Sequence, residues 1–205
     1  MGCLQSIIRK IIFILIIVAF FSLGGYTFVK KMINNYQNPT REEFVTSEKN
    51  YGDFSNVSSD YQLSRSYNLF GYKKINAKYL PTGQKITIFD MKNEKRIVPE
   101  DFKTTEIDKK LSEVLDKTKD SFITFEDFKI VQRGEYKISG KTIPYIKYSA
   151  KVKNIPFKNV VGIIGAYSTK NARAKENSTK VIFTMVDKKA FNPAIVQGFV
   201  QGVKF

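Results

Sequence analysis

The side chains available for catalysis are restricted from the outset. The 205-residue sequence contains no histidine and a single cysteine, Cys3, which excludes histidine catalysis, histidine metal ligands and, beyond the N-terminus, thiol chemistry. Two adjacent carboxylate pairs remain, Glu100-Asp101 and Glu126-Asp127. Neighbours on a strand point to opposite faces, so we expect neither pair to act on one substrate. We therefore expect a protein that is not an enzyme and uses no cofactor or metal. The alternative is a membrane-anchored hydrolase using serine and lysine, or carboxylates that converge from distant segments.

The stretch 134–142, GEYKISGKT, is similar to a phosphate-binding loop. The pattern G-x-x-x-x-G-K-[ST] needs four residues between its glycines, whereas five residues separate Gly134 from Gly140. We also expect a strand to follow, so no helix N-terminus would direct its amides at a phosphate. A hairpin turn is the interpretation that we adopt.

Lysine supplies the strongest candidate surface. Lys and Arg outnumber Asp and Glu by 34 to 19, which gives a formal net charge of +15. In TIPYIKYSAKV, apolar and lysine-bearing positions alternate, which predicts a strand with one core face and one lysine face. A basic loop over 169–179 follows the next strand. The residues that we predict to contact an anionic lipid surface or an acidic protein are Lys147, Lys151, Lys153, Lys170, Arg173 and Lys175. An AT-rich genome would also produce a lysine-rich composition without any functional cause.

The sequence pattern of residues 73–205 predicts an α+β domain, whose strands and helices would position these lysines. Residues 74–80 and 84–90 predict two strands around a turn at Pro81-Thr82-Gly83. Residues 105–121 predict a helix, because Ile107 and Leu111 begin an apolar stripe of helical period. The expected architecture is an antiparallel sheet flanked by helices.

The second half of this domain is expected to consist of successive antiparallel strands. These strands begin near residue 125, with turns at Arg133-Gly134 and at 139–141, and VVGIIGAYS is apolar enough for a central strand. A helix from Pro193 closes the chain, with Asn192 as its N-cap.

Residues 11–29, IIFILIIVAFFSLGGYTFV, are 19 consecutive residues without a charge. A helix of this length reaches roughly 28 Å, close to the ~30 Å hydrocarbon core of a bilayer. We predict a single-pass transmembrane helix there, after a cytoplasmic stub of residues 1–10 and before a juxtamembrane linker of residues 30–72. Because a short basic stub ahead of a first apolar segment is typical of a signal anchor, we expect the large domain to be extracytoplasmic at the plasma (inner) membrane. That location argues against nucleic-acid binding.

Two other uses of the N-terminus stay open. A cleaved signal peptide would have its apolar core from Ile11 to Phe21 and a small-x-small site at Ser22-Leu23-Gly24. The apolar run resumes through Val29, which favours an uncleaved anchor. MGCLQS also fits the N-myristoylation pattern at Gly2, with Cys3 as a candidate for palmitate.

From about residue 72 the order of elements resembles the PsbP-like αβα sandwich, which is also found in DcrB-type bacterial envelope lipoproteins. The resemblance rests on YLPTGQKITIF, on FKIVQRGEYKISGKTIPYIKYSA and on the closing FNPAIVQGFVQGVKF. DcrB-type proteins carry a lipidated cysteine where this chain has its apolar segment. The resemblance implies a non-enzymatic binding or assembly module, and it transfers no site residues. We therefore expect an envelope module with a basic surface that assembles or stabilises a membrane complex, or binds a small ligand.

Overall fold

The computed structural model describes residues 26–67, 73–90, 97–117, 124–138, 141–153, 158–170 and 177–204. The chain divides into two compact units, Met1–Pro39 and Thr40–Phe205. The first unit contributes helix α2 (Tyr26–Gln37) to the described residues. The predicted membrane span 11–29 lies outside the described residues except for its last four, which begin α2. Within the part of the chain that the structure describes, no helix has both the length and the hydropathy that crossing a membrane requires.

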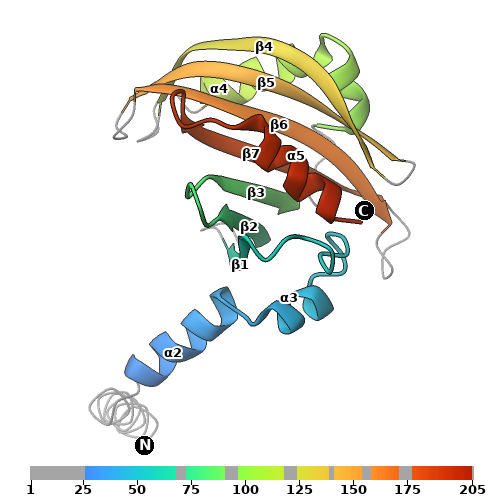
Figure 1. Ribbon diagram of the computed structural model, residues 1–205. Coiled ribbons are helices and arrows are strands. Elements are labelled where there is room, and N and C mark those ends of the chain that lie inside the picture. Colours follow the sequence, from blue (N-terminus) through green and yellow to red (C-terminus); the bar gives the residue numbers. More distant parts are fainter. Residues whose placement is uncertain are drawn as a thin grey trace, which may run out of the picture. The chain divides into compact units, whose positions relative to one another are not determined.

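The second unit is built on an antiparallel sheet of seven strands in the order β1-β2-β3-β7-β6-β5-β4 (Figure 1). Two meanders, β1-β2-β3 and β4-β5-β6-β7, meet where β3 pairs with β7. The predicted α+β class with an antiparallel sheet is therefore confirmed, and the apolar β6 is a central strand as expected. The strands are β1 (Tyr61–Tyr67), β2 (Lys73–Tyr79), β3 (Lys85–Asp90), β4 (Thr124–Ile138), β5 (Lys141–Lys153), β6 (Asn159–Lys170) and β7 (Asn177–Asp187).

One face of the sheet is packed by α3 (Arg41–Ser47) and α5 (Pro193–Gly202), and Figure 1 shows α5 lying across it. The predicted start of α5 is confirmed, because the Asn192 side chain accepts a hydrogen bond from the Ala194 N–H at 3.0 Å. The amide of Gln84 then holds Asn192 from both sides, donating to its carbonyl at 3.1 Å and accepting from its N–H at 3.0 Å. The helix residues buried on this face are Phe44, Ile195, Val196, Phe199 and Val200.

The opposite face is packed by the 3-10 helix η2 (Pro99–Lys103) and by α4 (Glu106–Lys117). The helix begins one residue after the start of the predicted 105–121 and is described as far as Lys117, because residues 118–123 lie outside the described residues. Its apolar stripe is confirmed at Ile107 and Leu111, which are both buried. On the strands below, Tyr148 lies so close to Gly162 that a Cβ on the glycine would come within 2.7 Å of the tyrosine ring. The sheet is thus covered by helices on both faces.

The compact unit begins earlier than the sequence suggested. Residues 30–72 were expected to form a linker, but the unit starts at Thr40, and residues 61–67 pair with β2 as the first strand. The reason lies in the aromatic residues of this segment, because Phe44, Tyr51 and Phe54 are buried in the core under α5. Within this segment the sequence indicates a short helix from Arg41, because Thr40 and Glu43 have the spacing of a capping box, and the structure shows this capping box at the start of α3.

One predicted turn is wrong. Arg133-Gly134 was expected to reverse the chain, but β4 runs through both residues without a break. Gly134 instead faces Tyr145 on β5, and a Cβ at Gly134 would lie 2.6 Å from that tyrosine's ring. The glycine is needed for this close approach of a ring to the neighbouring backbone. The β4–β5 connection falls at residues 139–140, which lie outside the described residues.

Candidate anion-binding surface

Three of the predicted lysines lie on one face of β5. Lys147, Lys151 and Lys153 alternate with residues buried on the opposite face, as the sequence pattern predicted; those buried residues are Ile146, Tyr148, Ala150 and Val152. The lysines share their face with Ile143, which packs against α5 residues, and lie beyond the part that the helix covers. The side chains of Lys151 and Lys153 are 59% and 63% exposed. We call the surface of Lys147, Lys151 and Lys153 the lysine face.

A β-bulge in β4 brings two carboxylates onto the lysine face. Glu126 is paired with Lys151 and Lys129 with Ser149, so β4 has one residue more than β5 in this interval. The bulge contains Asp127, whose φ of 50° lies in the left-handed region. Asp127 then lies 2.6 Å from Lys151, and Glu126 lies 2.5 Å from Lys153. The argument that adjacent acids must face opposite sides is therefore wrong for this pair.

The two bulge acids partly neutralise the lysine face. Its hydrogen bond and ion pair with Lys151 hold the pKa of Asp127 below its usual value, and the same contact raises the pKa of Lys151. Each carboxylate of the pair thus accompanies a cation on an exposed surface.

Lys147 is held differently from its two neighbours. Its ammonium group lies 5.3 Å from the centre of the Phe191 ring, in the segment that leads into α5. This side chain is partly buried, so its aliphatic stem covers the junction between β5 and α5. Lys147 therefore joins the lysine face to the start of the helix.

The other predicted residues do not extend the lysine face. Lys170 ends β6 and pairs with Asn177, whereas the β6 partner of Lys151 is Asn159. Eleven residues of extended strand separate Asn159 from Lys170, which is roughly 36 Å at ~3.3 Å per residue. Arg173 and Lys175 lie outside the described residues. The lysine row of β5 and the loop after β6 are thus at opposite ends of the sheet.

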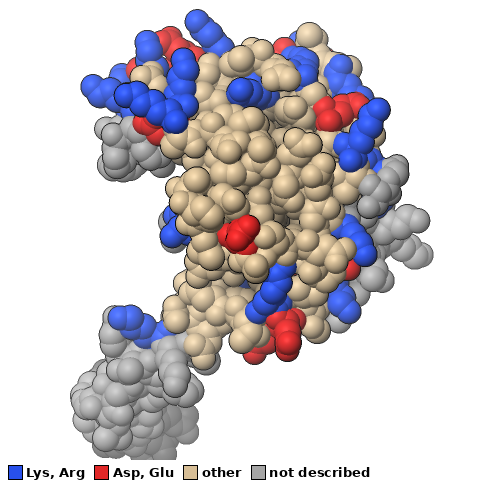
Figure 2. Space-filling view, viewed as in Figure 1, with Lys and Arg blue, Asp and Glu red and all other residues tan. Residues whose placement is uncertain are grey.

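Sequence reasoning missed four lysines that do lie near Lys151 and Lys153. Lys129 is opposite Ser149 and so shares their face. The carbonyl of Lys158 accepts from the Val152 N–H at 2.8 Å. The remaining two, Lys188 and Lys189, follow β7, and the Lys188 N–H donates to the Asn159 carbonyl at 3.0 Å. All four are exposed. They belong to three separate segments, and only the register of the antiparallel strands could have indicated that they meet. In the view of Figure 2, Lys and Arg side chains gather with some carboxylates at the upper left, where β4 begins and β5 ends in Figure 1.

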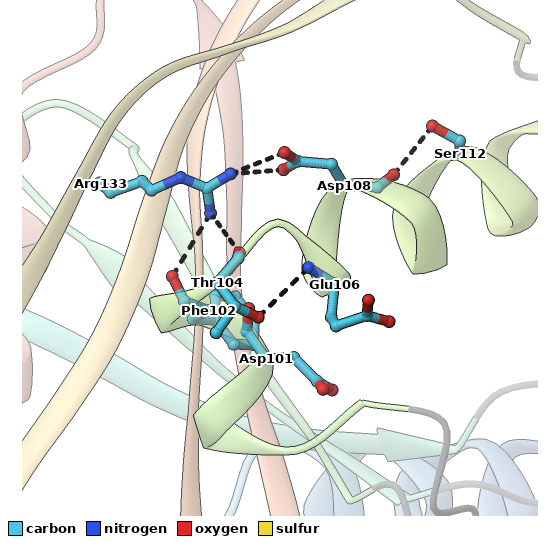
Figure 3. Close-up of polar contacts among 7 residues, drawn as sticks. All are labelled: Asp101, Phe102, Thr104, Glu106, Asp108, Ser112 and Arg133. Carbon is cyan, nitrogen blue, oxygen red and sulfur yellow. Dashed lines mark hydrogen bonds and ion pairs between the residues drawn. The ribbon is translucent and has the colours of Figure 1, made fainter.

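A second charged cluster joins β4 to the helices on the opposite face (Figure 3). The Arg133 guanidinium donates to both carboxylate oxygens of Asp108, at 2.6 and 2.8 Å. It also donates to the carbonyls of Thr104 at 3.1 Å and Phe102 at 3.4 Å. This fork connects one arginine of the sheet to η2, to the start of α4 and to the segment between them. Its role is to attach these helices.

The two acids of the Glu100-Asp101 pair lie in different environments, one nearly buried and the other exposed. The Asp101 carboxylate is nearly buried and accepts from the Val98 N–H at 2.7 Å and from the Lys110 ammonium at 2.7 Å. Glu100 is exposed. The two acids therefore do not converge, although they lie in the 3-10 helix η2 and not in the strand that the sequence argument assumed. Among the described residues, no group of three or more acids or cysteines is placed to hold a metal ion.

No family model matches the sequence, and no curated protein matches it. Arguments about its function therefore rest on the surface just described.

Proposed function

We propose that this protein is a non-catalytic binding or assembly module that residues 11–29 anchor in the plasma (inner) membrane, with the folded unit extracytoplasmic. Its basic surface would contact an anionic lipid surface or an acidic membrane-protein partner. The observation that carries the proposal is the lysine face, which α5 leaves open to solvent beside Lys129, Lys158 and Lys188. A lysine-rich, exposed surface attracts polyanions through the local field that it creates.

The layers of the fold support a PsbP-like assignment as part of this proposal. An antiparallel sheet with η2 and α4 on one face and α3 and α5 on the other is the layer order of an αβα sandwich. Binding modules of this kind need no acid–base group in a cleft. The Glu126 and Asp127 carboxylates, which are paired with lysines, fit that description.

The location is tested with the full chain in cells. We expect the chain to stay in the membrane fraction after carbonate extraction, and protease added outside spheroplasts to digest the folded unit. Release into the carbonate supernatant would refute the anchor. Retention with complete protection from protease would refute the orientation alone.

The basic surface is tested separately, on the full chain in neutral detergent micelles. We expect Lys147→Glu/Lys151→Glu/Lys153→Glu to elute from an immobilised polyanion at clearly lower salt than the unmodified chain, because exposed charge pairs are screened by salt. The matched control makes the same charge change at Lys49, Lys137 and Lys204, which are exposed and lie away from the lysine face. Equal shifts in both triple variants would show that net charge alone matters, and the lysine face would be withdrawn as the site.

A further inference from the structure

We propose that one end of the sheet, which includes Lys151 and Lys153 of the lysine face, docks on the headgroup layer of an anionic bilayer and inserts Leu80 into it. This inference rests on the proposed function and names the partner of the same surface. We call this region the basic end. It comprises the β2–β3 turn with the adjoining Asp60, the start of β4, the end of β5, residue 158 and the end of β7 with the segment after it.

The strand register brings these segments to the same end. Thr87 pairs with Phe183, so the chain before Lys85 lies beside the chain after Met185. The Gln84 amide confirms this by binding the backbone of Asn192. From there, backbone bonds join residue 188 to residue 159 and residue 158 to residue 152, which completes the line from the β2–β3 turn to β5.

Positive charge dominates the basic end. Among the described residues there, eight lysines face four acids, an excess of four positive charges. None of the eight cations is an arginine. The lysines are Lys78, Lys85, Lys129, Lys151, Lys153, Lys158, Lys188 and Lys189, and the acids are Asp60, Glu126, Asp127 and Asp187. Near an anionic membrane surface each such lysine strengthens binding by about fivefold.

An exposed apolar side chain lies at the β2–β3 turn, where this line of lysines begins. Leu80 is 55% exposed at the tip of the β2–β3 turn, and the neighbouring Pro81 and Thr82 are exposed too. Its backbone is fixed, because the Leu80 N–H donates to the Asp60 carbonyl at 2.8 Å and the Gly83 N–H to the Tyr79 carbonyl at 2.7 Å. A leucine presented on a fixed turn among lysines suits the boundary between headgroups and acyl chains.

The form of the basic end favours a bilayer over a folded acidic protein or a nucleic acid. Its lysines come from several strands, and β2 and β4 are five strand spacings apart, roughly 24 Å at ~4.8 Å each. Lysine is a flexible point charge, whereas protein and nucleic-acid interfaces favour the planar fork of arginine. Nucleic-acid binding would also use exposed aromatic rings for stacking on bases. The ring of Phe191 is half-buried and is covered by the Lys147 ammonium group. A broad surface whose cations are all lysines, with one protruding leucine, fits a fluid layer of phosphate headgroups.

The test places an environment-sensitive fluorophore on the turn. The full chain carries Cys3→Ser and Thr82→Cys, is labelled at residue 82 and is reconstituted in vesicles of phosphatidylcholine alone or with phosphatidylglycerol. We expect a blue shift and quenching by lipid-borne nitroxides only in the phosphatidylglycerol vesicles, and reversal by salt. The matched control carries the label at Thr142, which is exposed at the other end of β5, and we expect no change there.

Two variants of the labelled chain test separately the insertion of Leu80 and the electrostatic attraction of the lysines. Leu80→Ser should weaken the phosphatidylglycerol-dependent signal about tenfold, since a leucine side chain contributes about that factor when it leaves water. Lys151→Glu/Lys188→Glu should weaken it at least as much. Normal circular dichroism of both variants excludes unfolding as the cause.

The unfavourable outcomes are distinct from failure of the proposed function. Equal signals in both vesicle types, in a chain that resists carbonate extraction, would overturn docking while leaving the anchor intact. A signal insensitive to Leu80→Ser would overturn insertion. A shift produced equally by soluble polyglutamate or RNA would assign the basic end to an acidic macromolecule and overturn the bilayer as its partner.

Discussion

The carboxylate of Asp127 on β4 lies 2.6 Å from the ammonium group of Lys151 on β5, and the aspartate reaches it with a φ of 50°. A residue other than glycine pays a conformational penalty in that region, although Asp and Asn tolerate it better than most. The bulge therefore places a counter-charge on the lysine face at some expense in backbone strain. The pair moderates the charge that a polyanion would meet.

Removal of both counter-charges is expected to strengthen polyanion binding. Glu126→Gln with Asp127→Asn leaves Lys151 and Lys153 unpaired, and asparagine keeps the tolerance for positive φ. Each lysine released near an anionic surface contributes about 1 kcal/mol, so affinity for a polyanion should rise about fivefold or more. Elution of the full chain from an immobilised polyanion, in neutral detergent micelles, measures this gain as a shift to higher salt.

The matched control for this gain is Glu42→Gln with Glu113→Gln. Both residues are exposed, the first on α3 beside β1 and the second on α4 across the sheet. This control changes the net charge by the same amount. Unchanged circular dichroism of both double variants excludes unfolding as the cause of a gain. An increase of the same size in the control would contradict a local role for the bulge acids.

Replacement of Arg133 is expected to loosen η2 and α4. Arg133→Met removes the fork to Asp108 and to two backbone carbonyls, in a partly exposed setting where solvent screens the ion pair. We expect a loss of about 1–2 kcal/mol in the free energy of unfolding by urea, with faster amide exchange in α4. Lys137→Met, an equal charge change on the same strand, should stay within about 0.5 kcal/mol. Similar losses of stability in both variants would contradict a specific role of Arg133 in attaching η2 and α4.

Local sequence signals predicted the ends of helices well. Asn192 before Pro193 predicts both the cap and the first turn of α5, and Thr40 with Glu43 predicts the capping box of α3. These signals act over three or four residues, so they need no knowledge of the fold. The alternation of lysines in β5 is of the same local kind.

Features that depend on a partner strand could not be predicted in this way. The bulge at Asp127 exists only relative to β5, and a one-residue insertion reverses which side each acid faces. β1 was missed because Arg65 stands at a core-facing position; its charge is met by the buried Glu48 at 3.1 Å, from the C-terminal end of α3. A contact between two residues 17 positions apart does not change the periodicity of the sequence, so the pattern could not predict it.

Alkaline pH is expected to destabilise the fold through its buried tyrosines. Burial, with the nearby Tyr79 and Asp60, raises the pKa of Tyr61 to about 12, and its hydroxyl donates to the Ile195 carbonyl at 2.5 Å. Burial also raises the pKa values of Tyr136, Tyr148 and Tyr167. A phenol with a raised pKa in the folded state contributes stability below about pH 10, where the unfolded chain would begin to ionise. That stability is lost as the pH rises from about 10 to the folded-state pKa.

Urea unfolding at increasing pH, with tyrosinate absorbance read in parallel, measures this effect. The free energy of unfolding should be flat from neutral pH to about 9 and then fall. Tyr61→Phe should remove about 1 kcal/mol at neutral pH and should make the alkaline decline shallower. A decline that is unchanged in Tyr61→Phe would show that Tyr61 ionises like an exposed tyrosine.

The ion pair between Lys180 and Asp90 is expected to couple β7 to β3 more strongly than any surface pair. Lys180 is 2% exposed, its ammonium lies 2.8 Å from the Asp90 carboxylate, and the Tyr51 ring centre is 4.7 Å away. Lys180→Met would leave the carboxylate without this cation, with a loss of about 2–3 kcal/mol. Asp90→Asn alone should also destabilise, whereas the double variant should lose less than the sum. A double-mutant cycle in urea should therefore give a coupling of about 1 kcal/mol or more.

The matched cycle on the exposed Lys109–Glu106 pair, 3.0 Å apart, should give less than about 0.5 kcal/mol, and equal couplings would contradict the role of burial.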